Sequence, residues 1–369
     1  MTWDDGRLKR LVKDLVCMES PSFDAQGVEQ VELRLAEEMD AQGAECLFYP
    51  TDRGPVLEVR RGRGGALLLG HADTVWPRST LQKMPFGDAG GVLSGPGVLD
   101  MKAGLVYTLA ALSQLGPDVP FDWLVTPDEE VGSEASRTLI EDRAHGAPVV
   151  LVAEPGGVGG ALKIGRAGVG SFLLEIVGIQ SHAGPDPEAG ASAIRELAQQ
   201  ILWLGSLENH LLGTTVNVGV VEGGSRPNVI AGQAKAQIDI RVRTSKEMER
   251  MQETLNHPPH FDARTSIHYV GGFSRPPMDL RPEAARWFDV AADIWQGLTG
   301  ARLDGLNVGG ASDGNFTAAL APTLDGLGAV GQGAHAVHEQ VQWEYTQPRI
   351  QLIRSLIEQA FRNGQEGTL

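Results

Sequence analysis

The chain has 369 residues, 42% hydrophobic and 21% charged, which is typical of a folded globular protein. Its formal charge of −16 argues against nucleic acid or an anionic membrane as partner, because both bind basic surfaces. No apolar stretch reaches about 18 residues, and the N-terminus has no uninterrupted apolar core, so we expect neither a transmembrane helix nor a secretory signal. We therefore expect a cytoplasmic protein whose two cysteines, Cys17 and Cys46, are buried thiols.

The first part of the chain shows the pattern of an α/β sheet with helices on both faces. Apolar spacing predicts helices over 7–18 and 27–41, and a third over 103–115. The apolar positions expected to face the core from the second helix are Val28, Val31, Leu33 and Leu35. Short apolar runs, which are typical of buried strands, lie between the helices: PVLEVR, GALLLG, FDWLVT and PVVLVAE.

The pattern changes in the middle of the chain. The expected elements are a strand at 168–178, a helix at 190–206, the strands TTVNVGVVEGG and GQAKAQIDIRVR, a helix at 245–256 and the strand RTSIHYVGG. Their β-α-β-β-α-β order predicts a ferredoxin-like unit. The first pattern then resumes with a helix at 282–298 and the apolar run TLDGLGAV. We therefore predict a mixed-sheet α/β/α domain (residues 1–165 and 275–369) with an inserted ferredoxin-like α+β domain (residues 166–274).

A histidine and a carboxylate follow one buried strand, in the stretch ALLLGHADTVWP. His71 and Asp73 point the same way, because residues two apart share one face of a strand. Open α/β sheets bind ligands at this end of their strands. A carboxylate beside a histidine fixes the imidazole tautomer, as a metal ligand needs. Taken alone, the pair fits a structural salt link equally well.

Two further stretches place acids after turns or strands. In GPGVLDMKAG, Asp100 lies between a Gly-rich turn and the start of a helix, where a helix N-cap is the alternative role. In VTPDEEVGS, Asp128, Glu129 and Glu130 follow a predicted strand. Adjacent carboxylates repel one another unless they are solvated or bind cations. A solvated acidic turn is therefore the alternative to a metal site.

Similar residues follow two later apolar runs. Glu154 ends the run VVLVAE, and His335 and His338 follow a Gly-rich stretch in GLGAVGQGAHAVHEQV. His335 and Glu339 are four residues apart and would share one face of a bend or helical turn. Together, the strand ends of one sheet carry two histidines and at least three carboxylates. This set predicts two zinc ions with mixed nitrogen and oxygen ligands, bridged by one carboxylate.

Over nearly its whole length the chain resembles the dizinc metallopeptidase and deacylase family, which includes glutamate carboxypeptidase of the carboxypeptidase G type, acetylornithine deacetylase, succinyl-diaminopimelate desuccinylase and aminoacylase. The motifs that carry the resemblance, in the family's order, are GHADTVWP, GPGVLDMKAG, TPDEEVGS, VAEPG, SHAG, GGASDGN and GAHAVHE. The first two look closest to the glutamate carboxypeptidase branch. The resemblance implies a hydrolase that cleaves the amide bond before a C-terminal, glutamate-like amino acid in a peptide or N-acyl conjugate. The alternative is an N-acyl-amino-acid deacylase, which uses the same chemistry.

The resemblance also implies a metal-binding role for each matching position. His71 and Glu154 would hold one Zn²⁺, and Glu130 and His335 would hold the other. Asp100 would bridge the two ions. Co²⁺ or Mn²⁺ could replace zinc, because availability rather than sequence selects among these ions.

Three other positions match residues that act around the metals. Asp73 would orient His71, and Glu129 would be the general base for a metal-bridged hydroxide. His182, in the SHAG motif, would reach the active site of the partner subunit. The resemblance therefore implies a homodimer that forms through the inserted domain.

Recognition of a substrate carboxylate needs a fixed cation. Arg241 and Arg243, in QIDIRVR, share one strand face. A solvated strand face is the alternative, but the resemblance favours Arg241 as a bidentate clamp. Asn217, in TTVNVGVV, could donate to the substrate's carbonyl or carboxylate. The expected partner is thus a small peptide or N-acyl amino acid.

Overall fold

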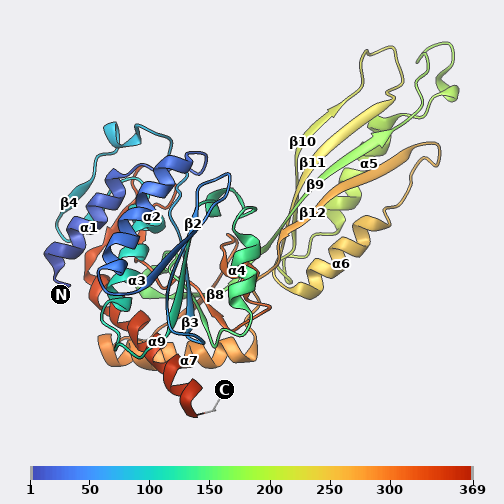
Figure 1. The fold of residues 1–369 in the computed structure, drawn as a ribbon. Coiled ribbons are helices and arrows are strands. Elements are labelled where there is room, and N and C mark those ends of the chain that lie inside the picture. Colours follow the sequence, from blue (N-terminus) through green and yellow to red (C-terminus); the bar gives the residue numbers. More distant parts are fainter. Residues whose placement is uncertain (1–2, 367–369) are drawn as a thin grey trace. The chain divides into compact units, whose positions relative to one another are not determined.

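The computed structural model describes residues 3–366, which form two compact units. Within the described residues, the first unit runs to Ile164 and also contains Leu280–Val308 and the chain from Ser312 onward. The second unit comprises Gly165–Asp279 and Gly309–Ala311. Figure 1 traces the elements of each unit, and each is described by itself below.

A six-stranded sheet forms the centre of the first unit. Its strands are β1 (Glu45–Tyr49), β2 (Val56–Arg61), β3 (Ala66–His71), β6 (Phe121–Thr126), β7 (Val150–Val152) and β14 (Thr323–Leu324). They lie in the order β1-β2-β6-β3-β7-β14. The last four strands in this order run parallel, while β2 is antiparallel to both β1 and β6. The sheet is therefore mixed, and the predicted α/β class is confirmed.

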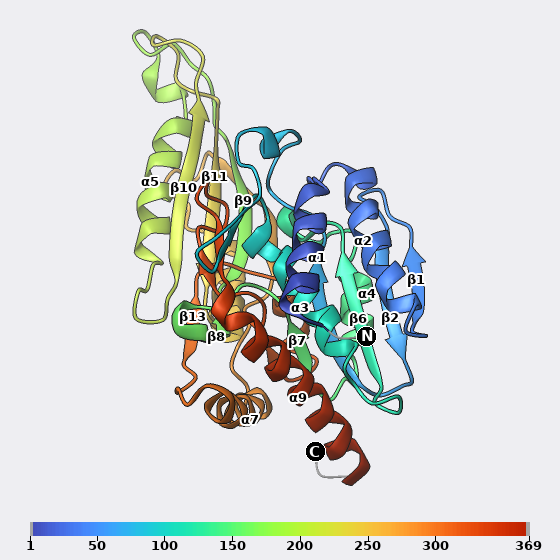
Figure 2. The same cartoon turned by 90° about the vertical axis from the view of Figure 1, so that its left-hand side faces the viewer.

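Helices cover both faces of this sheet (Figure 2). One face packs against α1 (Asp5–Cys17), α2 (Ala25–Asp40), α3 (Ala103–Leu112), α7 (Pro282–Thr299) and α9 (Thr346–Glu366). The other face packs against α4 (Arg137–Ala144) and α8 (Gly314–Thr317). In β3, Leu68 packs in the core on the first face, whereas Leu67 and Leu69 pack in the core on the face that α4 and α8 cover. This alternation is what the two-residue period of a strand requires.

A smaller four-stranded sheet lies in the same unit and carries two loops that matter for the site. Its strands, in sheet order, are β15 (Gly331–Gln332), β16 (Gln340–Gln342), β5 (Val92–Ser94) and β4 (Gly87–Ala89). The β16–β5 pairing sets Gln340 opposite Ser94. Residues 333–339 and 95–100 thus start from neighbouring strands. A separate two-stranded sheet pairs β8 (Leu162–Arg166) with β13 (Gly305–Val308).

The predicted core face of α2 is wrong at one position. Val31 and Leu35 are fully buried, but Leu33 is 39% exposed and Glu32 is 0% exposed. At 3.6 residues per turn it is Glu32, rather than Leu33, that shares the face of Val31 and Leu35. Neither carboxylate oxygen of Glu32 has a hydrogen-bond partner among residues 3–366. Burial raises the pKa of Glu32 to about 10, so the side chain is a neutral acid at physiological pH.

Glu32→Gln is expected to stabilise the protein increasingly as the pH rises. The folded state keeps the Glu32 proton up to about pH 10, whereas the unfolded chain loses it above its ordinary pKa. Wild-type stability therefore falls with rising pH across this interval, by at most about 1.4 kcal/mol per pH unit. Melting temperatures of both proteins at pH 6 and pH 8.5 measure the effect. The exposed Glu37→Gln on the same helix is the control, and an equal response in both variants would contradict the prediction.

Two expectations from composition have different outcomes. Among residues 3–366, no helix is both long and apolar enough to cross a membrane. Cys17 is exposed and Cys46 is partly exposed, so the expectation of two buried thiols is wrong. Cys17 is the last residue of α1, where its side chain turns away from the buried face that Leu15 and Val16 occupy.

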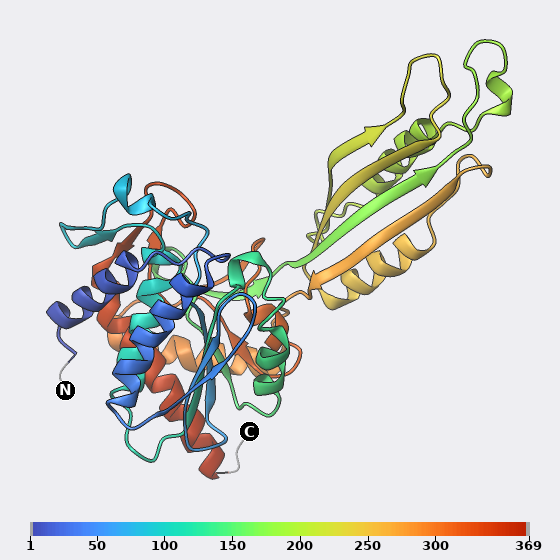
Figure 3. The same ribbon diagram turned by 45° about the horizontal axis from the view of Figure 1, so that its top comes forward.

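The second unit is an antiparallel sheet with two helices on one face (Figure 3). Its elements are β9 (Gly168–Val177), α5 (Ala193–Ser206), β10 (Thr215–Gly223), β11 (Gln233–Val242), α6 (Ser245–Asn256) and β12 (Ser266–Arg275). The sheet order is β10-β11-β9-β12, with every neighbour antiparallel. This is the ferredoxin-like arrangement that the element order predicts. Alternate residues of β9 and β11, such as Leu174, Ile238 and Ile240, form the core under the helices.

Candidate metal centre

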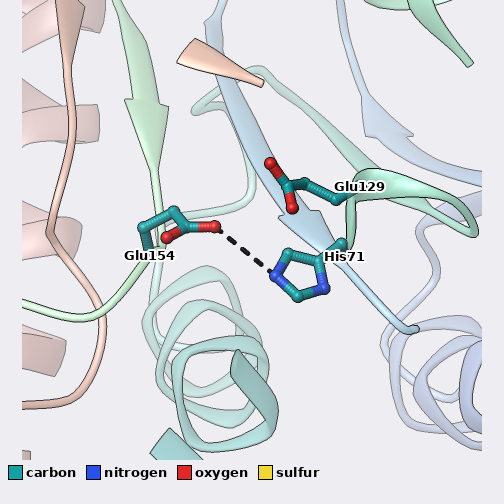
Figure 4. Close-up of side chains that lie close together, drawn as sticks. All are labelled: His71, Glu129 and Glu154. Atoms are coloured by element: carbon teal, nitrogen blue, oxygen red, sulfur yellow. Dashed lines mark ion pairs between the residues drawn. The ribbon is translucent and has the colours of Figure 1, made fainter. Parts of the chain in front are cut away.

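His71 is the last residue of β3, at the edge of the sheet where the parallel strands β3, β6 and β7 end. The side chain is 1% exposed. Its Nδ1 lies 2.9 Å from the backbone oxygen of Asp73 and 3.4 Å from Oδ1 of the same residue. On the other side of the ring, Nε2 lies 3.3 Å from Asp100 Oδ1 and 3.4 Å from Glu154 Oε1. Figure 4 shows the His71–Glu154 pair together with Glu129, whose carboxylate lies close to the same ring.

Asp100 presents one carboxylate oxygen to each of two histidines. Its Oδ1 faces His71, and its Oδ2 lies 3.3 Å from His335 Nε2. Glu130 joins on the second side, with Oε2 3.1 Å from His335 Nε2. The structure therefore brings together residues that are up to 264 positions apart in the chain. The cluster thus has two lobes that share Asp100. The first lobe contains His71 and Glu154, and the second contains His335 and Glu130.

The distances between these atoms fit metal coordination. A tetrahedral zinc with nitrogen and oxygen ligands at about 2.1 Å separates any two ligand atoms by about 3.4 Å. The nitrogen–oxygen distances in both lobes lie between 3.1 and 3.4 Å. Two groups can each place one ligand atom per residue within 4.8 Å of the others, namely His71 with Asp100 and Glu130, and His71 with Glu129 and Glu154. Imidazole nitrogen and carboxylate oxygen are also the donor types that zinc takes.

The ionisable side chains of the cluster shift one another's pKa values. Burial acts to lower the pKa of His71, but hydrogen bonds to carboxylates, Asp100 first, raise it well above its ordinary value. Hydrogen bonds to Asp100 and Glu130 raise the pKa of His335 to about 10. Burial acts to raise the pKa of Asp100, but both histidines outweigh it and hold the pKa below its usual range. A cation that binds here therefore competes with protons for the imidazole nitrogens.

A family model described as Peptidase family M20/M25/M40 matches residues 67–359. The chain belongs to this peptidase family. The match covers the motifs on which the resemblance rests and spans both units. The predicted family is confirmed, and this M20 peptidase is a metallo-hydrolase.

The M20 peptidase is also similar to individual relatives and solved structures. It is 28% identical to carboxypeptidase G2 from Pseudomonas sp., over 75% of this chain and 69% of that protein. It is 26% identical to succinyl-diaminopimelate desuccinylase from Bordetella parapertussis, over 94% of this chain and 96% of that protein. Aminopeptidase PepT from Bacillus cereus shares the fold with a TM-score of 0.80 at 21% identity, covering 97% of this chain and 99% of that chain. An M20 family metallo-carboxypeptidase from Sulfolobus solfataricus shares it with a TM-score of 0.67 at 15% identity, with the same coverage.

Asp73 connects the strand end of the M20 peptidase to the acidic turn that follows β6. Its Oδ1 accepts a hydrogen bond from the Glu129 backbone N–H (3.1 Å), and its Oδ2 accepts one from the Glu130 N–H (3.2 Å). The Ser22 hydroxyl donates to Oδ2 as well (2.7 Å). One buried carboxylate thus fixes the backbone of both glutamates relative to His71.

Two buried acids hold the same turn, a role that was predicted for neither of them from the sequence. Asp128 lies on the inside, where it accepts hydrogen bonds from the Ser136 hydroxyl (2.6 Å) and a backbone N–H. Asp313, in the GGASDGN motif, accepts from the Thr126 hydroxyl (3.0 Å) and from the Ser133 hydroxyl. The acidic turn of the M20 peptidase is therefore not simply solvated, because Asp128 faces its interior. The motif around Asp313 was the only signal that could have found the second acid.

Two lysines lie close to the ligand-bearing segments. Lys102 is buried and donates to the backbone oxygens of Leu15 (2.8 Å) and Met18 (2.6 Å), so it caps the C-terminal end of α1. Burial lowers the pKa of Lys102 to about 7. Lys163 Nζ lies 3.7 Å from Glu154 Oε2, the oxygen that does not face His71.

The other three predicted site residues of the M20 peptidase lie in the second unit. His182 is exposed, and its Nδ1 accepts a hydrogen bond from the Gly184 N–H (3.2 Å). Arg241 makes a bidentate pair with Asp239 on its own strand, at 2.8 and 2.9 Å. Asn217 is exposed on β10, opposite Asp239 in the register. The proposed roles of these three residues stay predictions.

Proposed function

We propose that this M20 peptidase is a dizinc hydrolase that cleaves the amide bond before a C-terminal, glutamate-like amino acid in a peptide or N-acyl conjugate. The placement of Asp100, with one oxygen toward each histidine, carries the proposal. His71 and Glu154, which lie close together, would hold one ion, and His335 and Glu130 would hold the other. Co²⁺ or Mn²⁺ could occupy the same ligands.

Glu129 is the proposed general base and acid. When bound, the two cations supply Lewis-acid activation of a water molecule and of the scissile carbonyl. The Glu129 carboxylate lies in the cluster beside His71 and Glu154, and Asp73 holds its backbone. It takes a proton from the attacking water as the new C–O bond forms. It then gives that proton to the amine as the C–N bond breaks, so that water adds across the amide.

The charge of the loaded site suits an anionic substrate. Two Zn²⁺ carry +4, and the carboxylates of Asp100, Glu129, Glu130 and Glu154 carry −4, so the centre is near neutral although the chain carries −16.

Arg241 is the proposed clamp for the substrate's carboxylate, and Asn217 is a proposed further donor. To bind the substrate, the Arg241 guanidinium must leave Asp239. Fork-shaped guanidinium recognition is bidentate, which a lysine cannot reproduce.

A substrate panel combined with metal analysis tests this function. We expect two divalent ions per chain and fastest release of glutamate from N-acyl-glutamates and from dipeptides that end in glutamate. The second candidate, an N-acyl-amino-acid deacylase, is favoured by the match to the desuccinylase over 94% of this chain. It predicts faster cleavage of N-succinyl or N-acetyl amino acids. Failure to cleave any amide on the panel in the metal-loaded state would reject both.

We also propose that the protein is a cytoplasmic homodimer in which His182 stabilises the developing oxyanion across subunits. A His182→Ala chain mixed with a Glu129→Ala chain tests the trans role. After random exchange, half of the dimers are mixed and each has one complete site, so about a quarter of the wild-type activity should return. No recovery, with mixed dimers demonstrated, would reject the role.

A further inference from the structure

One buried carboxylate outside the proposed ligand set binds the turn that carries Asp100. Glu339 is 0% exposed. Its Oε1 accepts hydrogen bonds from the backbone N–H groups of Leu99 (2.8 Å) and Asp100 (3.0 Å). Its Oε2 accepts from the Gly97 N–H and from the Trp76 indole N–H, at 2.9 and 2.8 Å. All four donors come from residues more than 200 positions away in the chain.

Each segment that meets at Glu339 carries a proposed metal ligand. Trp76 belongs to the stretch that starts at His71, and the turn over 97–100 contains Asp100. Glu339 itself follows His335 by four residues. Strand pairing between β5 and β16 brings two of these segments near each other, but it ends before the ligands are reached. The carboxylate of Glu339 is therefore a side-chain connection common to all three segments.

Only an ionised carboxylate fits this set of donors. Its two oxygens offer about four lone-pair sites, which match the four N–H groups. An amide has one acceptor oxygen, and its NH₂ group would face two N–H donors, leaving them without an acceptor in a buried place. The position of the 97–100 backbone, and with it the direction of the Asp100 side chain, thus depends on the charge and length of Glu339.

We propose that Glu339 is a positioning residue, which sets Asp100 so that its two oxygens face His71 and His335. This inference rests on the proposed metal centre. Loss of outer partners of metal ligands typically weakens metal affinity by about 10- to 100-fold. Because Glu339 reaches the metals only through Asp100 and the adjoining segments, its loss should alter both lobes together.

Glu339→Gln tests the proposal through metal binding rather than activity. We expect Zn²⁺ affinity, measured by chelator competition, to fall by about 10- to 100-fold. We also expect the visible absorption spectrum of the Co²⁺-loaded protein to change, because the ligand geometry changes. The matched control is Glu196→Gln in the second unit. Glu196 is also buried and accepts from two backbone N–H groups, those of Phe261 and Asp262. This control should lower the melting temperature and leave metal affinity unchanged.

The outcomes separate positioning from general stabilisation. Wild-type affinity and spectrum in a folded Glu339→Gln protein would overturn the proposal, and so would an equal loss of affinity in Glu196→Gln. If Glu339→Gln does not fold, Glu339→Asp decides, since it keeps the charge but is too short to reach both Trp76 and the 97–100 turn. It should also bind Zn²⁺ more weakly, and wild-type affinity in it would overturn the proposal. A wild-type protein that binds no metal would instead contradict the proposed function.

Discussion

Replacement of Glu129 by Gln is expected to lower kcat for amide hydrolysis by about 1,000-fold or more while metal binding persists. Gln has the size of Glu and keeps the backbone hydrogen bond to Asp73, but it cannot accept a proton from water. The histidine–carboxylate distances that define both lobes involve Asp100, Glu130 and Glu154 rather than Glu129. The chemical step should therefore fail in an otherwise assembled site.

Initial rates with an N-acyl-glutamate, together with metal content of the same sample, measure this effect. Glu134→Gln is the matched control, because Glu134 lies exposed just beyond the same turn. It should retain wild-type rates. A Glu129→Gln enzyme with more than a tenth of the wild-type kcat would show that another group takes the proton. Loss of metal together with activity would show that Glu129 is a ligand instead.

Asp100→Asn is expected to remove at least one metal ion per chain and to abolish hydrolysis. An amide has one acceptor oxygen, so it cannot face both His71 and His335 as the carboxylate does. It also leaves the two histidines without the anion that holds them in place. The loss of metal affinity should exceed the roughly 100-fold that follows loss of an outer partner.

Metal stoichiometry after dialysis and kcat with added Zn²⁺ distinguish this variant from Glu129→Gln. The exposed Asp88→Asn on β4 serves as control and should bind two ions. Two ions bound to Asp100→Asn with unchanged affinity would mean that Asp100 does not bridge. Metal content therefore distinguishes the two variants, because Glu129→Gln should lose the base and keep the metals, whereas Asp100→Asn should lose metal.

The sequence indicated the parts of the site that lie at strand ends. Alternation in β3 places His71 and Asp73 on one side, and the structure adds that the backbone oxygen of Asp73 is the nearer partner of the ring. Apolar runs that end in Thr126 and Val152 locate the glutamates at 129, 130 and 154. Parallel strands in one sheet bring such ends together, so this convergence follows from local pattern and fold class.

The supporting acids could not be found in this way. Glu339, Asp128 and Asp313 lie in loops, where no periodicity marks a side chain as buried. Their partners are fixed by tertiary contacts, and for Glu339 the separation from Asp100 is 239 residues. The spacing of His335 and Glu339 suggested one shared face. In the structure both contact Asp100, one at its carboxylate and the other at its backbone N–H.

The fold shows a similar division between predictable and unpredictable parts. Alternation in β9 and β11 marks them as strands with one buried face, and the β-α-β-β-α-β order of elements predicts the arrangement of the second unit. The run TLDGLGAV, in contrast, forms a strand only over Thr323–Leu324, so its predicted extent is wrong. Gly326 adopts a φ of +78°, which a strand does not allow, and the chain turns there toward Lys163. The run contains two glycines, Gly326 and Gly328, and the sequence alone does not show at which of them the strand ends.

Anomalous diffraction from crystals of the Zn²⁺-loaded protein, recorded at the zinc absorption edge, tests the central claim most directly. The account predicts two peaks in the first unit, one between His71 and Glu154 and one between His335 and Glu130, with Asp100 touching both. A map with no peak at these side chains, or with zinc bound only elsewhere in a protein that hydrolyses its substrate, would contradict it.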